Sequence, residues 1–178
     1  MWLEVPRDQG RADDGEGRSL YRIAEVGAIV DLLREWFKSP QSSGLSFGVI
    51  SFYKAQALEI QRELDRQGLA TDRLRVGTVD SFQGMEFDVV LLSAVRTPDR
   101  SRLREDVDEK VNARHLFGHL CSSNRLNVSM SRQRKLLVVV GDPDLVEGDL
   151  AANHIPGLVD FYRISRKITT EGRKNARP

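Results

Sequence analysis

The stretch VGTVDSFQGMEFDVVLLSAVRT, from Val76 to Thr97, decides the fold that this sequence predicts. It contains two runs rich in Val and Leu, and such runs are typical of strands in a parallel sheet that is covered on both faces. Between the runs lies the polar loop DSFQGMEFD. A plain connection does not require Gln83, Gly84 and Glu86 so close together, which makes the loop a candidate binding site.

The sequence on either side of this stretch predicts an α/β fold. The expected strands cover residues 46–52, 74–79, 88–95 and 135–141. An amphipathic helix at 54–68 connects the first two strands, and another from Leu20 to Phe37 ends before Pro40. A strand, helix and strand of these lengths predict a right-handed parallel crossover, and therefore a layered fold with a mostly parallel central sheet.

Composition divides the chain into three parts. Residues 1–18 hold glycines and mixed charge with few large apolar side chains, so we expect a flexible lead-in outside the core. Residues 19–165 form the domain, and 166–178 form a basic tail for which solvation is the default and nucleic-acid contact the alternative. Within the domain, the charge-dense segment 99–114 predicts an exposed insertion or a partly disordered loop.

The overall composition is that of a globular protein with one core. The chain has 178 residues, and no apolar run approaches the roughly 18 residues that span a bilayer, so we expect no membrane segment. No secretory signal pattern is present, and the single cysteine, Cys121, indicates a reducing, cytoplasmic or otherwise intracellular compartment. Arginine supplies 21 of the 27 basic residues, which favours a phosphate partner or reflects an arginine-rich genome.

The polar loop after the strand at 74–79 carries groups that suit nucleic acid and nucleotide. Thr78, Asp80 and Ser81 lie at the carboxyl end of that strand, where hydroxyls and backbone amides can meet phosphate or sugar. Gly84 permits a tight turn, while Glu86 can only accept hydrogen bonds, which suits a sugar hydroxyl. The alternative is structural: Asp80 would cap a short turn and Glu86 would be solvated.

A second polar segment precedes the strand at 135–141. We interpret Asn124 to Arg134 as a short helix that places Arg125, Ser129 and Arg132 near one face. Arginines next to a buried strand are costly to bury without an anionic partner, so an intermittently bound phosphate is one explanation. The other is an ion pair with a carboxylate elsewhere in the fold.

The sequence does not favour a metal site. GDPDL at 141–145 is ordinary helix initiation by an aspartate cap and a proline, without a third ligand to support a metal at Asp142 and Asp144. His115 and His119 are four residues apart near Cys121, but no second pair and no HExxH pattern supports a zinc site. A nuclease reading would use Asp99, Asp106 and Asp108, which share one loop without supporting geometry.

Three segments together resemble a known family. GVISFYKAQ, VGTVDSFQGMEFDVVLLSAVRT and NRLNVSMSRQRKLLVVVGD resemble motifs IV, V and VI of the superfamily 1B helicases, the Upf1-like group that includes senataxin. The order and spacing of the motifs agree as well, over about residues 20 to 150. The resemblance implies the second, C-terminal RecA-like domain of a helicase, a three-layer α/β domain that binds ATP with Mg²⁺ in a cleft against a first RecA-like domain.

Carried over by position, the motifs imply roles for particular residues. Arg132 matches the motif VI arginine finger, which contacts the γ-phosphate and stabilises charge in the transition state. Glu86 matches the acid that accepts from the nucleotide ribose, with Gln83 and Gly84 in the same nucleotide-binding loop. The residues that match the strand-gripping region are Ser51, Tyr53, Thr78, Asp80 and Ser81, and those that match the bracing lead into motif VI are Arg125 and Asn127.

Departures from the family pattern limit what the chain can do alone. Ser129, Met130, Ser131 and Gln133 surround the finger where the family has Ala-Leu-Thr and Ala, although serine keeps the threonine hydroxyl. The sequence contains no GxxxxGK[ST] loop, no DExx-type acid segment and no QYRM-like stretch.

We therefore expect half of an ATP site, in the C-terminal motor domain of a longer helicase that acts on single-stranded DNA or RNA with its N-terminal RecA-like domain. We expect the isolated chain to be inactive as an ATPase. The family suggests 5′ to 3′ movement. The alternative is a non-catalytic nucleic-acid or protein-interaction module that kept the RecA-like fold.

Overall fold

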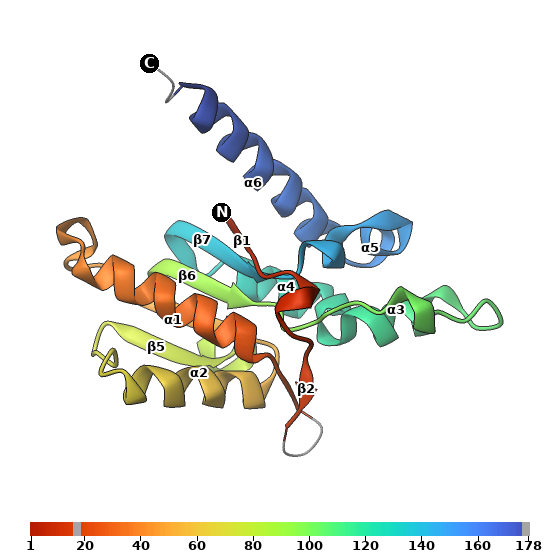
Figure 1. Cartoon of the computed structure of the whole chain (residues 1–178), viewed down its shortest axis with the longest axis horizontal. Helices are drawn as coiled ribbons and strands as arrows, with labels where there is room; N and C mark the ends of the chain where they lie inside the picture. The colour runs from red at the N-terminus through yellow and green to blue at the C-terminus, as the bar shows by residue number, and fades with distance from the viewer. Residues whose placement is uncertain (16–18, 176–178) are drawn as a thin grey trace.

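The computed structural model describes residues 1–15 and 19–175, which form three layers around a parallel sheet (Figure 1). Five strands make this sheet in the order β1-β7-β6-β4-β5, and every neighbouring pair is parallel. The strands are β1 Trp2–Glu4, β4 Phe47–Ser51, β5 Leu74–Thr78, β6 Phe87–Ser93 and β7 Gln133–Gly141. The short strands β2 Asp13–Asp14 and β3 Leu20–Tyr21 form a separate antiparallel pair.

Helices cover both faces of the sheet. Their bounds are α1 Ile23–Lys38, α2 Lys54–Arg66, α3 Glu109–Phe117, α4 Ser123–Met130, α5 Gly148–His154 and α6 Pro156–Asn175. One face packs on α1 and α2, and the other packs on α3 to α6. The far end of α6 extends away from the rest of the molecule (Figure 1). Within the described part of the chain, none of the helices has the length and apolar character needed to cross a membrane.

The strands alternate their side chains between two hydrophobic cores. In β6, for example, Val89 and Leu91 belong to the core under α1 and α2, whereas Val90 and Leu92 belong to the opposite core. This alternation follows from the two-residue period of a strand, and because both faces are covered the strands read as continuous apolar runs. The four strands and the crossover helix predicted from those runs are confirmed, within one or two residues at each end, as is the mostly parallel α/β fold.

The expectation that residues 1–18 lie outside the core is wrong for the first five residues. Trp2–Glu4 forms the edge strand β1, which pairs with Val139–Gly141, and Val5 is buried. The strand is only three residues long and its partner lies more than 130 positions away, so no local pattern indicates it. Residues 16–18 of the expected lead-in fall outside the described part of the chain.

Two other regions are more ordered than their composition suggested. Segment 99–114 was expected to be an exposed insertion or partly disordered loop, but α3 begins at Glu109 and buries Ala113 against the core. The expected tail at 166–178 continues α6 as far as Asn175, and 176–178 lie outside the described residues. Leu20 belongs to β3 instead of the first long helix, because α1 starts at Ile23.

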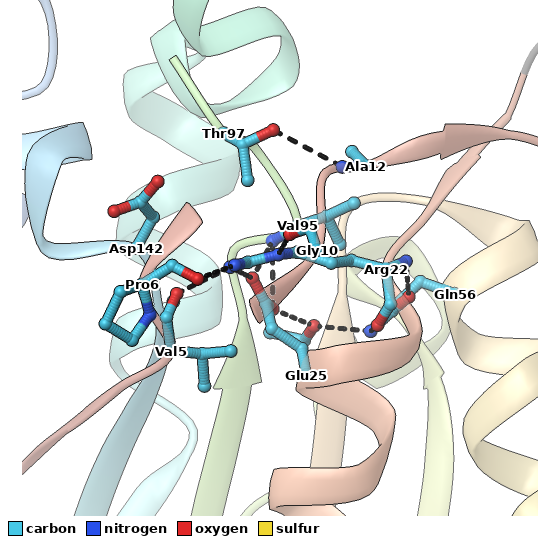
Figure 2. A network of polar contacts seen from close by, with 12 residues as sticks. Val5, Pro6, Gly10, Ala12, Arg22, Glu25, Gln56, Val95, Thr97 and Asp142 are labelled. Atoms are coloured by element: carbon cyan, nitrogen blue, oxygen red, sulfur yellow. Dashed lines mark hydrogen bonds and ion pairs between the residues drawn. The ribbon is translucent and has the colours of Figure 1, made fainter. Parts of the chain in front are cut away.

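A fully buried ion pair fastens the amino-terminal segment to the end of the sheet (Figure 2). Arg22 and Glu25 are both 0% exposed, and Nη1 of Arg22 lies 3.2 Å from Oε1 of Glu25. The Arg22 guanidinium also donates to three carbonyl oxygens of the segment after β1, those of Val5, Pro6 and Gly10, at 2.7–2.8 Å. These bonds hold the segment in place although little apolar surface is available to it.

The carboxylate of Glu25 completes the network on the sheet side. It accepts from the Ser93 hydroxyl at 2.6 Å and from the Val95 N–H at 3.0 Å. Gln56 connects Arg22 to Ser93, the residue that donates to Glu25. Its amide oxygen accepts from the backbone N–H of Arg22, and its amide nitrogen donates to the Ser93 hydroxyl. Val95 has φ of 68°, a left-handed conformation that a β-branched residue rarely adopts. The network therefore holds a strained backbone at the carboxyl end of β6.

We predict that Glu25→Gln lowers the free energy of unfolding by about 3–5 kcal/mol, because it leaves the buried Arg22 charge without its counter-ion. Urea denaturation followed by circular dichroism measures the change. The matched control is Glu35→Gln on the same helix, since Glu35 is exposed and, among the described residues, pairs with Lys38 alone. This control should stay within about 0.5 kcal/mol of the unchanged chain. A loss below about 1 kcal/mol for Glu25→Gln would show that the buried pair is dispensable.

Candidate functional site: two edges of the sheet joined by a loop and a helix

The loop at 79–86 runs across one face of the sheet along the strand direction. It starts where the parallel strands end, which we call the carboxyl edge, and finishes where they begin, which we call the amino edge. It leaves the carboxyl end of β5 in a 3₁₀ turn, Val79–Phe82, and enters the amino end of β6. Phe82 is completely buried and its ring lies over Gly48 and Gly77, where an added Cβ would come within 2.9 and 3.1 Å of the ring. These two glycines in neighbouring strands create the space that lets the loop lie against the sheet.

Helix α4 spans the same two edges in the same direction. At its start, Arg125 forms an ion pair with Asp80 at 2.7 Å, beside the carboxyl end of β5. Past its end lies Arg132, whose backbone carbonyl accepts from the Phe87 N–H at the start of β6 at 2.9 Å. The predicted helix at 124–134 is therefore confirmed as Ser123–Met130, and Arg132 stands just beyond it.

Arg132 lies at the amino edge and is held by neutral groups. Its Nε donates to the Val128 carbonyl at 3.0 Å, Nη2 to the Ser131 hydroxyl at 3.0 Å and Nη1 to the Met85 carbonyl at 3.5 Å. Within the described residues no carboxylate lies within ion-pairing distance of it. The guanidinium is half-buried, so it is positioned and oriented while its charge remains unneutralised.

The other predicted nucleotide-binding residues lie on the same loop. Gln83 and Glu86 are exposed, and Glu86 forms no hydrogen bond or ion pair with a described residue. Gly84 has φ of 77°, and no atom lies within 4 Å of the place where its Cβ would be. The glycine is therefore needed for the backbone turn and not for lack of space.

The residues predicted to grip a nucleic-acid strand lie near the carboxyl edge, but not all of them reach the protein surface. Asp80 and Ser81 are exposed, Thr78 is half-buried, and the Ser81 hydroxyl donates to the Thr78 carbonyl at 2.7 Å. Ser51 is 1% exposed, and its hydroxyl accepts from the Tyr53 N–H at 3.2 Å. This burial does not support a direct contact between Ser51 and a nucleic-acid strand. The Ser51 side chain instead orders the turn after β4.

Tyr53 is also largely buried, at 6% exposed, but it borders a cavity. Its ring packs at 5.1 Å from the ring of His119, and Cys121 lines the same cavity. Burial raises the pKa of the Tyr53 phenol, so the hydroxyl remains a hydrogen-bond donor near neutral pH. Burial likewise lowers the pKa of His119, with Arg125 and Arg96 acting in the same direction, which favours the neutral imidazole.

The two bracing residues differ. Arg125 pairs with Asp80, so for this arginine the ion-pair alternative is confirmed, and its guanidinium also lies 5.9 Å from the centre of the Phe52 ring. Asn127 is exposed on α4. Asp80 does not cap the turn at 79–82, because Thr78 holds the capping position and no side-chain cap bond forms. Asp80 instead serves as the partner of Arg125.

Among the residues considered for a metal, Asp142 has a structural role. The Asp142 carboxylate caps the turn Pro143–Val146 by accepting from the Asp144 N–H at 3.1 Å, as the sequence predicted. Among the described residues no group of three or more His, Cys, Asp or Glu side chains is placed to hold a metal ion.

Sequence reasoning missed a set of arginines at the carboxyl edge. They come from the segment after β1, the loop after β6 and helix α3: Arg7, Arg11, Arg96, Arg102 and Arg114. The excess of arginine over lysine was the only sequence signal, and it could not say which arginines converge. Their convergence depends on β1, which no local pattern indicated.

The chain is similar to a known protein family and to several helicases. A family model described as an AAA domain matches residues 1–144. Human RNA helicase Mov10l1 is 34% identical over 140 residues, which cover 78% of this chain and 11% of the relative. The Drosophila melanogaster Regulator of nonsense transcripts 1 homolog is 27% identical over 168 residues, 90% of this chain and 12% of the relative. The chain thus spans only a small part of these relatives.

A solved structure, the C-terminal domain of a possible DNA helicase from Lactobacillus plantarum WCFS1, is similar with a TM-score of 0.44 and 18% identity, over 79% of this chain and 72% of that one. The chain belongs to the AAA-domain family and, within it, to the superfamily 1B helicases as a C-terminal RecA-like domain. The family resemblance of motifs IV, V and VI is confirmed.

We predict opposite effects for two glycine substitutions. Gly84→Ala should lower the free energy of unfolding by about 1–2 kcal/mol, because an L-residue is strained at a φ of 77°. Gly27→Ala, inside α1 with no atom near the added Cβ, should raise it by about 0.5–1 kcal/mol. Urea denaturation of both variants tests the pair. If Gly84→Ala leaves the unfolding free energy unchanged, the loop does not require the left-handed turn.

Proposed function

We propose that this chain is the C-terminal motor domain of an ATP-dependent superfamily 1 helicase or translocase, and that it supplies the arginine finger and part of the grip on single-stranded nucleic acid. The observation that carries the proposal is Arg132. It is held by three neutral acceptors at the edge where the loop with Glu86 lies, and among the described residues no carboxylate neutralises it.

On the nucleotide side, the residues present fit half of an ATP site. Arg132 would approach the γ-phosphate, where a guanidinium stabilises the negative charge that develops during phosphoryl transfer. Glu86, exposed and without a partner among the described residues, would accept from a ribose hydroxyl, and Gln83 and Gly84 would shape the loop around it. The Mg²⁺ and the phosphate loop would come from the N-terminal RecA-like domain.

On the nucleic-acid side, polar groups at the carboxyl edge would contact phosphate and sugar. Thr78 ends β5 there, the exposed Asp80 and Ser81 follow it, and Tyr53, which borders a cavity, follows β4. Contacts of this kind do not read bases, so binding should be largely independent of sequence. Ser51 would act indirectly, by ordering the turn that carries Tyr53.

The loop at 79–86 and helix α4 would connect the two activities. Each runs between the carboxyl edge, where the nucleic-acid strand would lie, and the amino edge, where the nucleotide would lie. The Asp80–Arg125 ion pair joins them at the first edge, and the hydrogen bond from the Phe87 N–H to the Arg132 carbonyl joins them at the second. Closure of the nucleotide cleft on Arg132 would therefore move the strand contacts with it. This arrangement would make the polar loop the coupling element of the motor.

We predict that Arg132→Ala lowers ATP turnover by about 10³-fold or more in a two-domain protein that joins this chain to its N-terminal RecA-like domain. The matched control is Arg134→Ala, two positions further along, because Arg134 is exposed and pairs with Asp88. This control should retain turnover within about threefold. Steady-state phosphate release with single-stranded nucleic acid measures both.

The isolated chain should release no phosphate above background in the same assay. Robust turnover by the isolated chain that Arg132→Ala abolishes would contradict the half-site proposal. Full turnover by the two-domain Arg132→Ala variant would instead favour a non-catalytic role for this domain, in which the RecA-like fold serves binding alone.

We also predict that the isolated chain binds single-stranded oligonucleotides of unrelated sequence with similar affinity, and that the affinity falls as salt rises. Each phosphate contact should contribute about −0.7 to the slope of log affinity against log salt. Fluorescence anisotropy at several salt concentrations measures the slope. Binding that is insensitive to salt, or strictly specific for one sequence, would count against a backbone grip.

A further inference from the structure

A concave pocket of about 450 Å³ lies at the carboxyl edge, and none of its lining residues has a role carried over from the motifs, although Arg96 and Thr97 end the motif V segment. Its walls come from the segment after β1, the loop after β6 and helix α3. Five arginines line it: Arg7, Arg11, Arg96, Arg102 and Arg114. Such a density of guanidinium groups in one concave surface is a feature of phosphate-binding sites.

The pocket carries a large local excess of positive charge. Among the described residues that line it, the only carboxylate is that of Asp99, which lies 3.1, 4.0 and 3.4 Å from Arg7, Arg11 and Arg102. These lining residues carry five positive charges against one negative, an excess of four, on a chain whose net charge is +1. The hydrogen bond from Ser101, together with Arg7, keeps the pKa of Asp99 below its usual value, so the carboxylate stays charged and the excess does not grow near neutral pH.

Two of the arginines are not neutralised within the described residues. Arg96 donates to the backbone carbonyls of Leu116, at 2.7 Å, and of His115, interacts with the Tyr53 hydroxyl, and forms no ion pair with a described carboxylate. Arg114 is exposed and has no hydrogen bond or ion pair with a described residue. A half-buried guanidinium fixed by carbonyls, next to a free one, can receive an anion without first breaking an ion pair.

Hydrogen bonds between segments that are far apart in the sequence hold the walls of this pocket together. The Thr97 hydroxyl accepts from the Ala12 N–H at 3.3 Å, and Arg7 donates to the Pro98 carbonyl at 2.9 Å (Figure 2 draws the first). The strained Val95, fixed by Glu25, sits immediately before Arg96. Backbone strain of this kind is maintained only where the surrounding structure over-determines it, and it is concentrated at functional sites.

The pocket is also continuous with the proposed strand grip. It shares Leu20, Arg96 and Arg114 with the neighbouring cavity, which is lined further by Tyr53 and His119. Arg125 and Asp80, near His119, line the next depression along the edge. Three adjoining concavities thus follow the carboxyl ends of β5, β4 and β6, in that order, and end at the arginines.

We propose that this arginine pocket binds a backbone phosphate of single-stranded nucleic acid, so that the strand continues past Tyr53 and over Arg96 to the segment after β1. The inference rests on the proposed strand-binding function and extends its path. The same chemistry would also suit the phosphate of a small free ligand. A strand is favoured because the pocket opens into the cavities of the grip, whereas a free ligand requires no such continuity.

The test compares two double variants that each remove two exposed arginines. Arg11→Ala with Arg114→Ala alters the pocket, and Arg62→Ala with Arg66→Ala alters α2, where both arginines pair with glutamates on the helix surface. Both variants lose the same charge, so a difference between them reports position. Circular dichroism confirms that each is folded. Anisotropy then measures affinity for oligothymidine of about 6 and about 20 nucleotides at several salt concentrations.

The expected result is a loss of about tenfold or more in affinity for the long strand in the pocket variant, with a salt slope that is shallower by about 0.7, the contribution of the one phosphate contact that is lost. The short strand should lose less, because it can occupy the grip without reaching the pocket. The α2 variant should match the unchanged chain. These three outcomes together support the proposal.

Other outcomes overturn it in distinguishable ways. If the pocket variant keeps the affinity and salt slope of the unchanged chain, the pocket is not on the strand path, while the proposed strand binding stands. If calorimetry shows pyrophosphate binding that the pocket variant loses while strand affinity is unchanged, the ligand is a free phosphate compound. If the unchanged chain binds neither strand at low salt, the pocket inference and the strand-binding function both fail.

Discussion

The buried ion pair between Arg22 and Glu25 is the constraint on which the carboxyl edge of this domain depends. Removing two charges from water is costly, and only complete hydrogen bonding offsets that cost. Here the guanidinium reaches three carbonyls of the segment after β1, and the carboxylate reaches Ser93 and the strained Val95. Few backbone conformations can supply all of these hydrogen-bond partners to Arg22 and Glu25 at once. The ion pair therefore fixes one position for the amino-terminal segment, the start of α1 and the loop that carries Arg96.

A second constraint is steric and lies on the opposite face of the sheet. Gly48 and Gly77 leave room for the Phe82 ring, and the buried ring keeps the polar loop against the strands. An alanine at either glycine would bring a Cβ within about 3 Å of aromatic carbons, which a packed core cannot accommodate without shifting. The conformation of a polar, ligand-facing loop is thus determined by three apolar or side-chain-free positions.

Sequence patterns predicted the parts of the fold that repeat locally. The strands at 46–52 and 88–95 are visible because both of their faces are buried. The motif resemblance singled out Arg132 and Glu86, and the structure places both near the amino edge. Patterns could not predict β1, since three residues carry no period and their partner lies far away in sequence. The burial of Ser51 and Arg22 was missed for a related reason, because it depends on segments that only the folded chain brings together.

Helix α4 has one further consequence. It is two turns long, and the step from Arg125 to Arg132 covers seven residues, or about 10 Å at 1.5 Å per residue. Both ends are fastened to the same loop, at Asp80 and at Phe87. Because α4 and the loop are connected at both ends, neither can slide along the sheet without breaking one of these two contacts. Mechanical compliance in a motor built on this domain would then reside where the domain meets its neighbour, and step size would be set by that joint.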